Sequence, residues 1–84
     1  MEKQQKFAEA VRAYKDALAL APGDAQATAS LHTAEFSQHM AEGRKAMAAR
    51  RFPDGAREFE EALKVKPGNP EAADALKRAR EGRP

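Results

Sequence analysis

The fold of this 84-residue chain is decided by a segment that occurs twice. It reads FAEAVRAYKDALALAPGD over residues 7–24 and FPDGAREFEEALKVKPGN over residues 52–69, which is 45 positions later. Large apolar residues, small apolar residues and Pro-Gly pairs coincide without a gap. Helical periodicity alone would not align the Pro-Gly pairs as well. An internal repeat of this kind is typical of proteins that stack pairs of helices.

Both copies predict helices, because apolar residues recur every three or four positions. The Pro-Gly pairs end these helices, and Asp24 and Asn69 are suitable N-caps for the helices that follow. Between Asp24 and Arg51 there is one glycine and no proline, so we expect one long helix there. Short linkers predict antiparallel hairpins. The predicted fold is therefore all-α, a single domain over residues 1–84 with helices over 2–21, 24–50, 53–66 and 70–81.

The first helix of each copy resembles the second helix of a tetratricopeptide repeat. That family places an aromatic residue, a small residue, an aromatic residue, a small residue and a proline at fixed spacing. The first copy has Phe7, Ala10, Tyr14, Ala17 and Pro22 at these positions, and the second has Phe52, Gly55, Phe59, Ala62 and Pro67. The resemblance implies a fragment of an α-solenoid whose concave face binds protein or peptide.

The period of the repeat departs from that family. Tetratricopeptide repeats have 34 residues, and the 11 additional residues here make about three helical turns. Placed within residues 24–50, they lengthen that helix by about 16 Å and leave its apolar faces in phase. In this register one complete hairpin is flanked by two half-repeats, which leaves apolar surface uncovered because such units bury their faces only by stacking. We expect neighbouring repeats of a longer chain, or a homodimer, to cover it.

The long helix carries an apolar stripe that is a candidate partner-binding or dimer surface. Its residues are Phe36, Met40, Gly43, Arg44 and Met47. The same stripe also fits an ordinary core between helices, with Gly43 allowing another helix to approach closely. Arg44 stands where some family members have the asparagine that binds a peptide carboxylate, so that carboxylate clamp is not expected.

Catalytic, metal and cofactor chemistry is not indicated. No nucleophile with a nearby base, phosphate-binding loop or buried carboxylate pair can be assembled. His32 and His39 are expected to pair with Glu35 and Glu42 at i, i+3, because imidazoles seven residues apart lie about 10 Å from each other and cannot share a metal ion. The chain has no cysteine, no membrane-spanning run and no signal-peptide core, which favours a cytoplasmic protein.

The sequence therefore predicts a non-enzymatic protein-interaction or scaffold module that associates with itself. Two alternatives stay open. A helical-repeat nucleic-acid binder would use Arg44, Lys45, Arg50, Arg51 and the basic residues of 77–83, although 15 basic and 13 acidic residues give a net charge of only +2 and do not favour it. A structural spacer or self-assembly segment would have no partner except itself.

Overall fold

A computed structural model describes residues 2–83 of the chain, and the side chains of residues 6–83. The prediction of an all-α fold is confirmed: every element in this range is a helix. The helices are α1 (Glu2–Leu20), α2 (Ala25–Ala48), α3 (Phe52–Val65) and α4 (Pro70–Arg80). Their bounds lie within two residues of those predicted.

The predicted caps begin α2 and α4. The carboxylate of Asp24 accepts a hydrogen bond from the backbone N–H of Ala27 at 3.0 Å, and the side chain of Asn69 accepts one from the N–H of Ala72 at 2.9 Å. Each bond satisfies a backbone donor that has no partner within the first helical turn. Pro70 follows Asn69 at a position where its missing N–H costs nothing.

The long helix α2 is continuous over 24 residues, as the sequence predicted. It ends at Ala48, two residues early, because Arg50 adopts a left-handed backbone conformation with φ of 59°. The N–H of Arg51 then donates to the carbonyl of Ala46, and the N–H of Arg50 donates to the carbonyl of Met47. These two bonds satisfy the last carbonyls of α2 and turn the chain into α3.

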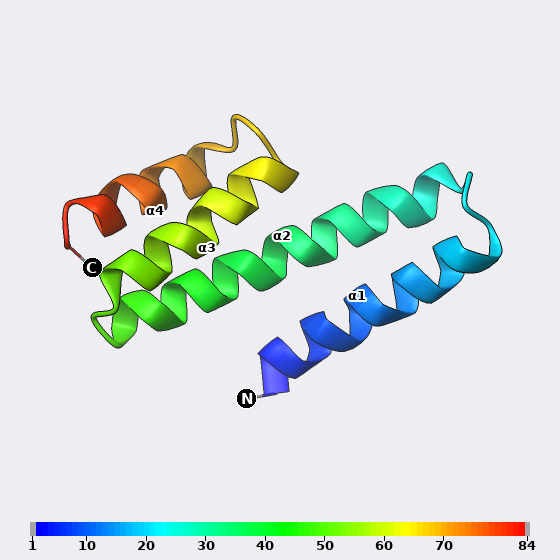
Figure 1. The fold of residues 1–84 in the computed structure, drawn as a ribbon, viewed down its shortest axis with the longest axis horizontal. Coiled ribbons are helices and arrows are strands. Elements are labelled where there is room, and N and C mark those ends of the chain that lie inside the picture. Colours follow the sequence, from blue (N-terminus) through cyan, green and yellow to red (C-terminus); the bar gives the residue numbers. More distant parts are fainter. Residues whose placement is uncertain (1, 84) are drawn as a thin grey trace.

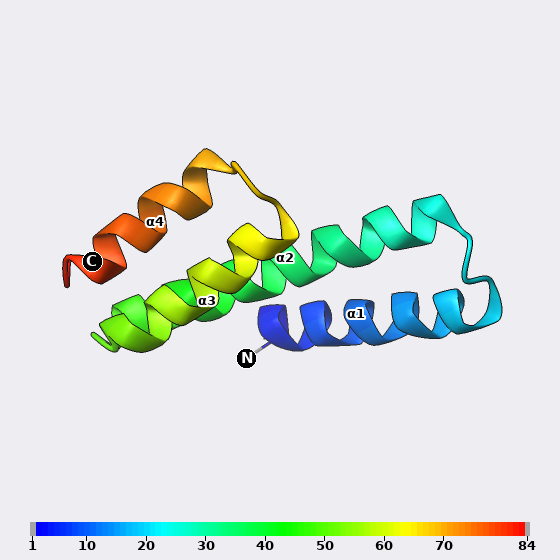
Figure 2. The same cartoon turned by 45° about the horizontal axis from the view of Figure 1, so that its top comes forward.

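The helices pack in the order of the sequence, with α1 on α2, α2 on α3, and α3 on α4. Figure 1 shows α1 running back along the first half of α2, and α3 running back along the second half on the opposite side. Figure 2 shows α4 returning along α3, away from α1. The molecule measures 43 × 28 × 14 Å, so its shortest dimension is close to the diameter of one helix.

The hydrophobic core lies at one end of this flat arrangement. It is formed by the second half of α2 together with α3 and α4, and contains Met40, Met47, Phe59, Ala62, Ala72, Leu76 and Ala79. At the other end the buried side chains of the described residues are Val11 of α1 and Ala34 of α2. The two copies of the repeat are therefore buried to different extents.

The helices that follow the two Pro-Gly turns differ in length for a local reason. Gly82, with φ of 68°, ends α4 through a bond from its N–H to the carbonyl of Ala79. The corresponding residue 45 positions earlier is Ser37, which lies within α2. A left-handed conformation is easy for glycine and costly for serine, so α2 continues where α4 stops.

Candidate functional site

The second copy of the repeat is closely packed by the second half of α2. Phe59 is 1% exposed, and its ring lies against Gly43, where a Cβ atom would come within 2.4 Å of a ring carbon. A Cβ atom on Gly55 would lie 3.1 Å from the sulfur of Met47. Gly43 therefore accommodates an aromatic ring of α3. Its carbonyl oxygen would lie 3.4 Å from a Cβ atom on Gly55, so another helix approaches Gly43 closely, as the sequence predicted.

The first copy leaves a groove between α1 and α2, which we call the α1–α2 groove. It has a volume of about 430 Å³ and is lined by Phe7, Ala10 and Tyr14 of α1 and by six residues of α2 between Gln26 and Ser37. None of these nine lining residues is charged, although a third of the whole chain is. The groove is thus the kind of surface that proteins bury.

A second pocket occupies the corresponding place in the second copy. This α2–α4 pocket of about 250 Å³ is lined by eight residues. Five of them, namely Phe59, Glu71, Asp74, Ala75 and Arg78, lie 45 positions after residues that line the α1–α2 groove. The other three are Met40, Arg44 and Met47 of α2. The α1–α2 groove therefore corresponds to the site that α2 covers in the second copy, and no helix of the described residues covers it in the first copy.

The two sites also differ in the charge of their lining residues. The α2–α4 pocket is partly open to solvent, and it carries Glu71, Asp74 and Arg78. The Nη2 atom of Arg44 lies 3.4 Å from Oε1 of Glu71, and the Nη2 atom of Arg78 lies 2.9 Å from Oδ2 of Asp74. The corresponding residues in the α1–α2 groove are Gln26, Ala29 and Thr33. The more open site is thus the uncharged one.

The apolar stripe predicted on α2 lies mostly within the chain's own core. Met40 is 3% exposed and Met47 is 9% exposed, and Gly43 is buried between them. Phe36 is half-buried, and the Nζ atom of Lys66 lies 5.1 Å from the centre of its ring. Only Arg44 of the five is exposed. The stripe provides contacts between helices of one chain.

The repeat-packing residues also have different environments in the two copies. Gly55, Phe59 and Ala62 are buried in the second copy, and Phe52 is half-buried. In the first copy Phe7, Ala10 and Tyr14 are half-buried and Ala17 is exposed. Both Pro22 and Pro67 are exposed in their turns. Ala10, Tyr14 and Ala17 are therefore more exposed than their counterparts in the second copy, which are buried.

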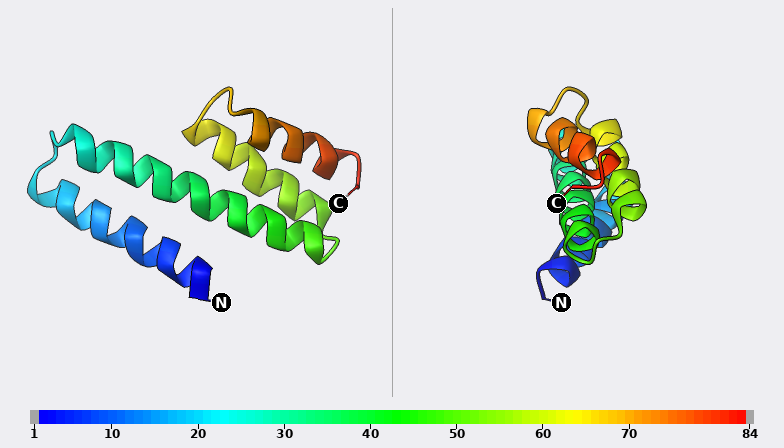
Figure 3. Two further views of the ribbon diagram at one scale, coloured as in Figure 1. Left: turned by 180° about the vertical axis from the view of Figure 1, so that it is seen from behind. Right: turned by 90° about the vertical axis from the view of Figure 1, so that its left-hand side faces the viewer.

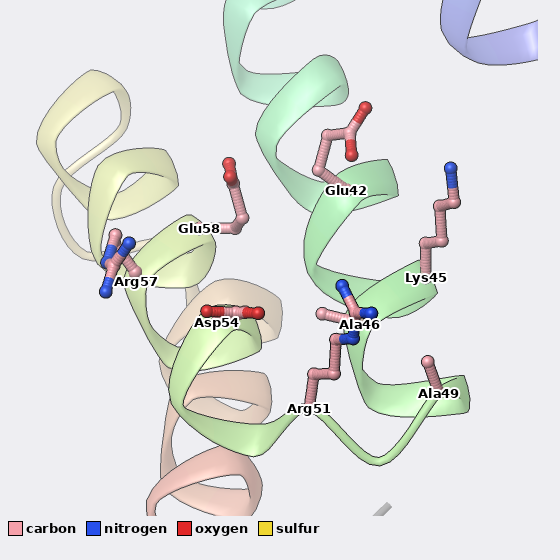
Figure 4. A pocket seen from close by; sticks show the side chains of 8 residues that line it. All are labelled: Glu42, Lys45, Ala46, Ala49, Arg51, Asp54, Arg57 and Glu58. Atoms are coloured by element: carbon pink, nitrogen blue, oxygen red, sulfur yellow. The ribbon is translucent and has the colours of Figure 1, made fainter.

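A further pocket lies where α2 turns into α3. Figure 4 shows its lining, which combines Glu42, Lys45, Arg51, Asp54, Arg57 and Glu58 with two alanines. Three acidic and three basic side chains balance each other in this pocket. A balanced lining gives neither the positive field that attracts nucleic acid nor the carboxylate cluster that binds a metal ion.

The histidine of this region has a different partner from the one predicted. The Nδ1 atom of His39 lies 2.9 Å from a carboxylate oxygen of Glu58 on α3, so the predicted pairing with Glu42 on the same helix is wrong. The contact joins two helices at a half-buried site. Over residues 2–83, no group of three histidine, cysteine or acidic residues has the arrangement of a metal site.

Arginine side chains of the C-terminal region lie close to acidic side chains. Arg78 pairs with Asp74. The Nη2 atom of Arg80 lies 4.0 Å from Oε1 of Glu60, and the Nη2 atom of Arg83 lies 2.7 Å from Oε1 of Glu81. Such pairs reduce the positive potential that a nucleic-acid binder needs. Among the helices of the described part of the chain, none has both the length and the apolar character required for crossing a membrane.

Comparisons with models of protein families, with curated proteins and with solved structures find no match to this chain. The resemblance to tetratricopeptide repeats thus rests on the spacing of residues in the sequence. The candidate site is accordingly defined by the internal comparison of the two copies.

Proposed function

We propose that this chain is a non-enzymatic protein-interaction module of the tetratricopeptide type, and that it binds a helix in the α1–α2 groove. The observation that supports this function most strongly is the pair of corresponding sites. In the second copy the site is covered by α2, which presents a large, a small and a large apolar residue at spacings of three and four. In the first copy no segment within residues 2–83 covers the site.

The chemistry of the groove indicates what kind of partner fits. Its lining offers apolar contact from Phe7, Tyr14 and the alanines, with hydroxyl groups from Ser30 and Thr33. A charged peptide would lose its hydration there without gaining an ion pair, which costs free energy. An amphipathic helix that presents its apolar face is the partner class that such grooves accept.

A peptide of the chain's own residues 36–50 is a suitable probe, because this segment includes the part of α2 that covers the second copy. Tyr14 is the one tyrosine and the chain has no tryptophan, so intrinsic fluorescence reports on the groove directly. At protein concentrations where the chain is monomeric, we expect saturable quenching or enhancement of Tyr14 emission as the peptide is added.

A matched control peptide carries Met40→Glu and Met47→Glu, which place charges on the apolar face. It is expected to leave the emission of Tyr14 unchanged. In the protein, Thr33→Arg introduces the residue type found at the corresponding Arg78 and is expected to weaken binding of the unmodified peptide. The proposed function is contradicted if neither this peptide nor self-association of the chain alters the environment of Tyr14.

A further inference from the structure

We propose that the α1–α2 groove is filled by α1 of a second copy of this chain, in an antiparallel two-fold dimer. This inference names the partner and therefore rests on the proposed function. It starts from the contacts by which α2 covers the second copy, because those contacts specify what a covering helix must present.

The apolar face of α1 has the pattern of the helix that covers the second copy. That helix presents Met40, Gly43 and Met47, which is large, small, large at spacings of three and four. The first helix presents Phe7, Ala10 and Tyr14, with the same order of sizes and the same spacings. Residues spaced in this way lie along one side of a helix, so α1 meets the requirement that the groove imposes.

The contact pairs of the second copy, transferred to two first copies, are consistent with two-fold symmetry. In the second copy Gly43 lies against Phe59, and Met47 lies against Gly55, with α2 and α3 antiparallel (Figure 1). By the 45-residue repeat, Phe59 corresponds to Tyr14 and Gly55 corresponds to Ala10. By the shared pattern of large, small and large residues, Gly43 corresponds to Ala10 and Met47 corresponds to Tyr14. Both pairs therefore become Ala10 of one protomer against Tyr14 of its partner.

This reciprocity is the property of an isologous interface, in which residue i contacts residue j and residue j contacts residue i. The same antiparallel register places Phe7 of one protomer against Ala17 of its partner. Ala17 is exposed here, whereas its counterpart Ala62 is fully buried. Leu20, which is 90% exposed, lies one turn beyond Ala17. Burial of α1 in a dimer would account for the apolar residues that this helix exposes.

The arrangement of helices leaves room for the second protomer. Figure 3 shows α1 at the edge of the molecule, separated by α2 from α3 and α4. In the dimer, α1 and the first half of α2 from two chains form a bundle of four helices. Ala10 replaces the glycine found at both corresponding positions of the second copy, so the two α1 helices lie farther apart than α2 and α3 do.

The first test changes one alanine on the proposed interface. Ala17→Glu places a carboxylate against the partner's Phe7, and an unpaired charge buried in an interface weakens association strongly. We expect its dimer dissociation constant to rise more than about 100-fold. The matched control is Ala19→Glu, two residues away in the same exposed helical turn but about 200° around the helix axis. Sedimentation velocity across a concentration series measures both variants, with far-UV circular dichroism as a check of folding.

Three outcomes of this series contradict the proposed dimer. They are a wild-type chain that stays monomeric at millimolar concentration, an Ala17→Glu variant that dimerises like the wild type, and equal weakening by the two glutamates. If the chain is monomeric but residues 36–50 still alter Tyr14 emission, the second-copy inference fails and the proposed function stands. If neither association nor peptide binding is seen, both fail.

A second test determines the orientation of the helices. The chain has no cysteine, so Ala17→Cys introduces a single thiol. In the antiparallel register the two Cα atoms of residue 17 lie about 15 Å apart along the axes, too far for a disulfide. We expect Ala17→Cys alone to stay uncrosslinked under mild oxidation, and its mixture with Phe7→Cys chains to form a disulfide-linked heterodimer. Rapid crosslinking of Ala17→Cys alone overturns the antiparallel arrangement.

Discussion

Substituting the glycine that lies against Phe59 tests how tightly the second copy is packed. In Gly43→Ala the new Cβ atom would lie 2.4, 2.7 and 2.8 Å from three ring carbons, more than 0.5 Å inside the usual carbon–carbon contact distance of about 3.5–4.0 Å. The ring is 1% exposed and is surrounded by the core. Because it cannot move without displacing its neighbours, the substitution overpacks this site.

Two opposing effects determine the magnitude. Alanine is favoured over glycine in a helix by about 1 kcal/mol, and overpacking a well-packed core costs about 1–3 kcal/mol. The clash at Gly43 falls at the severe end, so we expect a net loss of about 1–2 kcal/mol in the free energy of unfolding. For a chain of this length, that loss lowers the Tm by about 4–16 °C.

The matched control is Gly55→Ala, a second buried helical glycine. Its Cβ atom would lie 3.1 Å from the sulfur of Met47 and 3.4 Å from the carbonyl oxygen of Gly43. The thioether chain is flexible and can move by a few tenths of an ångström, so the helix preference dominates and the stability is unchanged or rises by up to about 1 kcal/mol. Urea unfolding followed by circular dichroism measures both variants. A Gly43→Ala protein as stable as Gly55→Ala would refute the reasoning.

Three other predictions concern single side chains. Phe59→Ala is expected to cost about 3–5 kcal/mol and Tyr14→Ala in the monomer only about 1 kcal/mol, measured by the same urea unfolding; equal losses would contradict the difference in burial. Asn69→Ala removes the N-cap of α4 and should cost about 1 kcal/mol, whereas Asn69→Asp should not. The hydrogen bond and charge of Arg83 lower the pKa of Glu81. Because the folded-state pKa is depressed, the stabilising contribution of this pair is present at neutral pH and is lost as the pH falls through the folded-state pKa of Glu81. Arg83→Gln should return the pKa of Glu81 toward its ordinary value in an NMR titration, and an unchanged pKa would show that the pair does not form.

The helices could be predicted because their signals are local. Asp24 and Asn69 mark helix starts by the hydrogen bonds that their side chains can make, and the Pro-Gly pairs mark the ends. The end of α2 at Arg50 could not be predicted in this way. A left-handed arginine is intrinsically unfavourable, and it is stabilised here by the turn that carries the chain from α2 into α3.

The candidate site could be predicted only in part. The repeat aligns Tyr14 with Phe59, but the spacing of residues did not predict the groove between α1 and α2. The relevant signal was present in the charges: Gln26, Ala29 and Thr33 stand where the other copy has Glu71, Asp74 and Arg78. The contact between His39 and Glu58 depends on how two helices pack, which the spacing within one helix does not specify.

The central claim is that the first copy is stabilised by association and the second copy by its own chain. Amide hydrogen exchange at low and high protein concentration tests it most directly, because it reports the stability of each helix separately. We predict that amides of residues 7–17 in α1 exchange rapidly in dilute solution and become protected as the concentration rises, while those of α3 and α4 do not change. Protection of α1 equal to that of α3 in dilute solution, with no dependence on concentration, would contradict the claim.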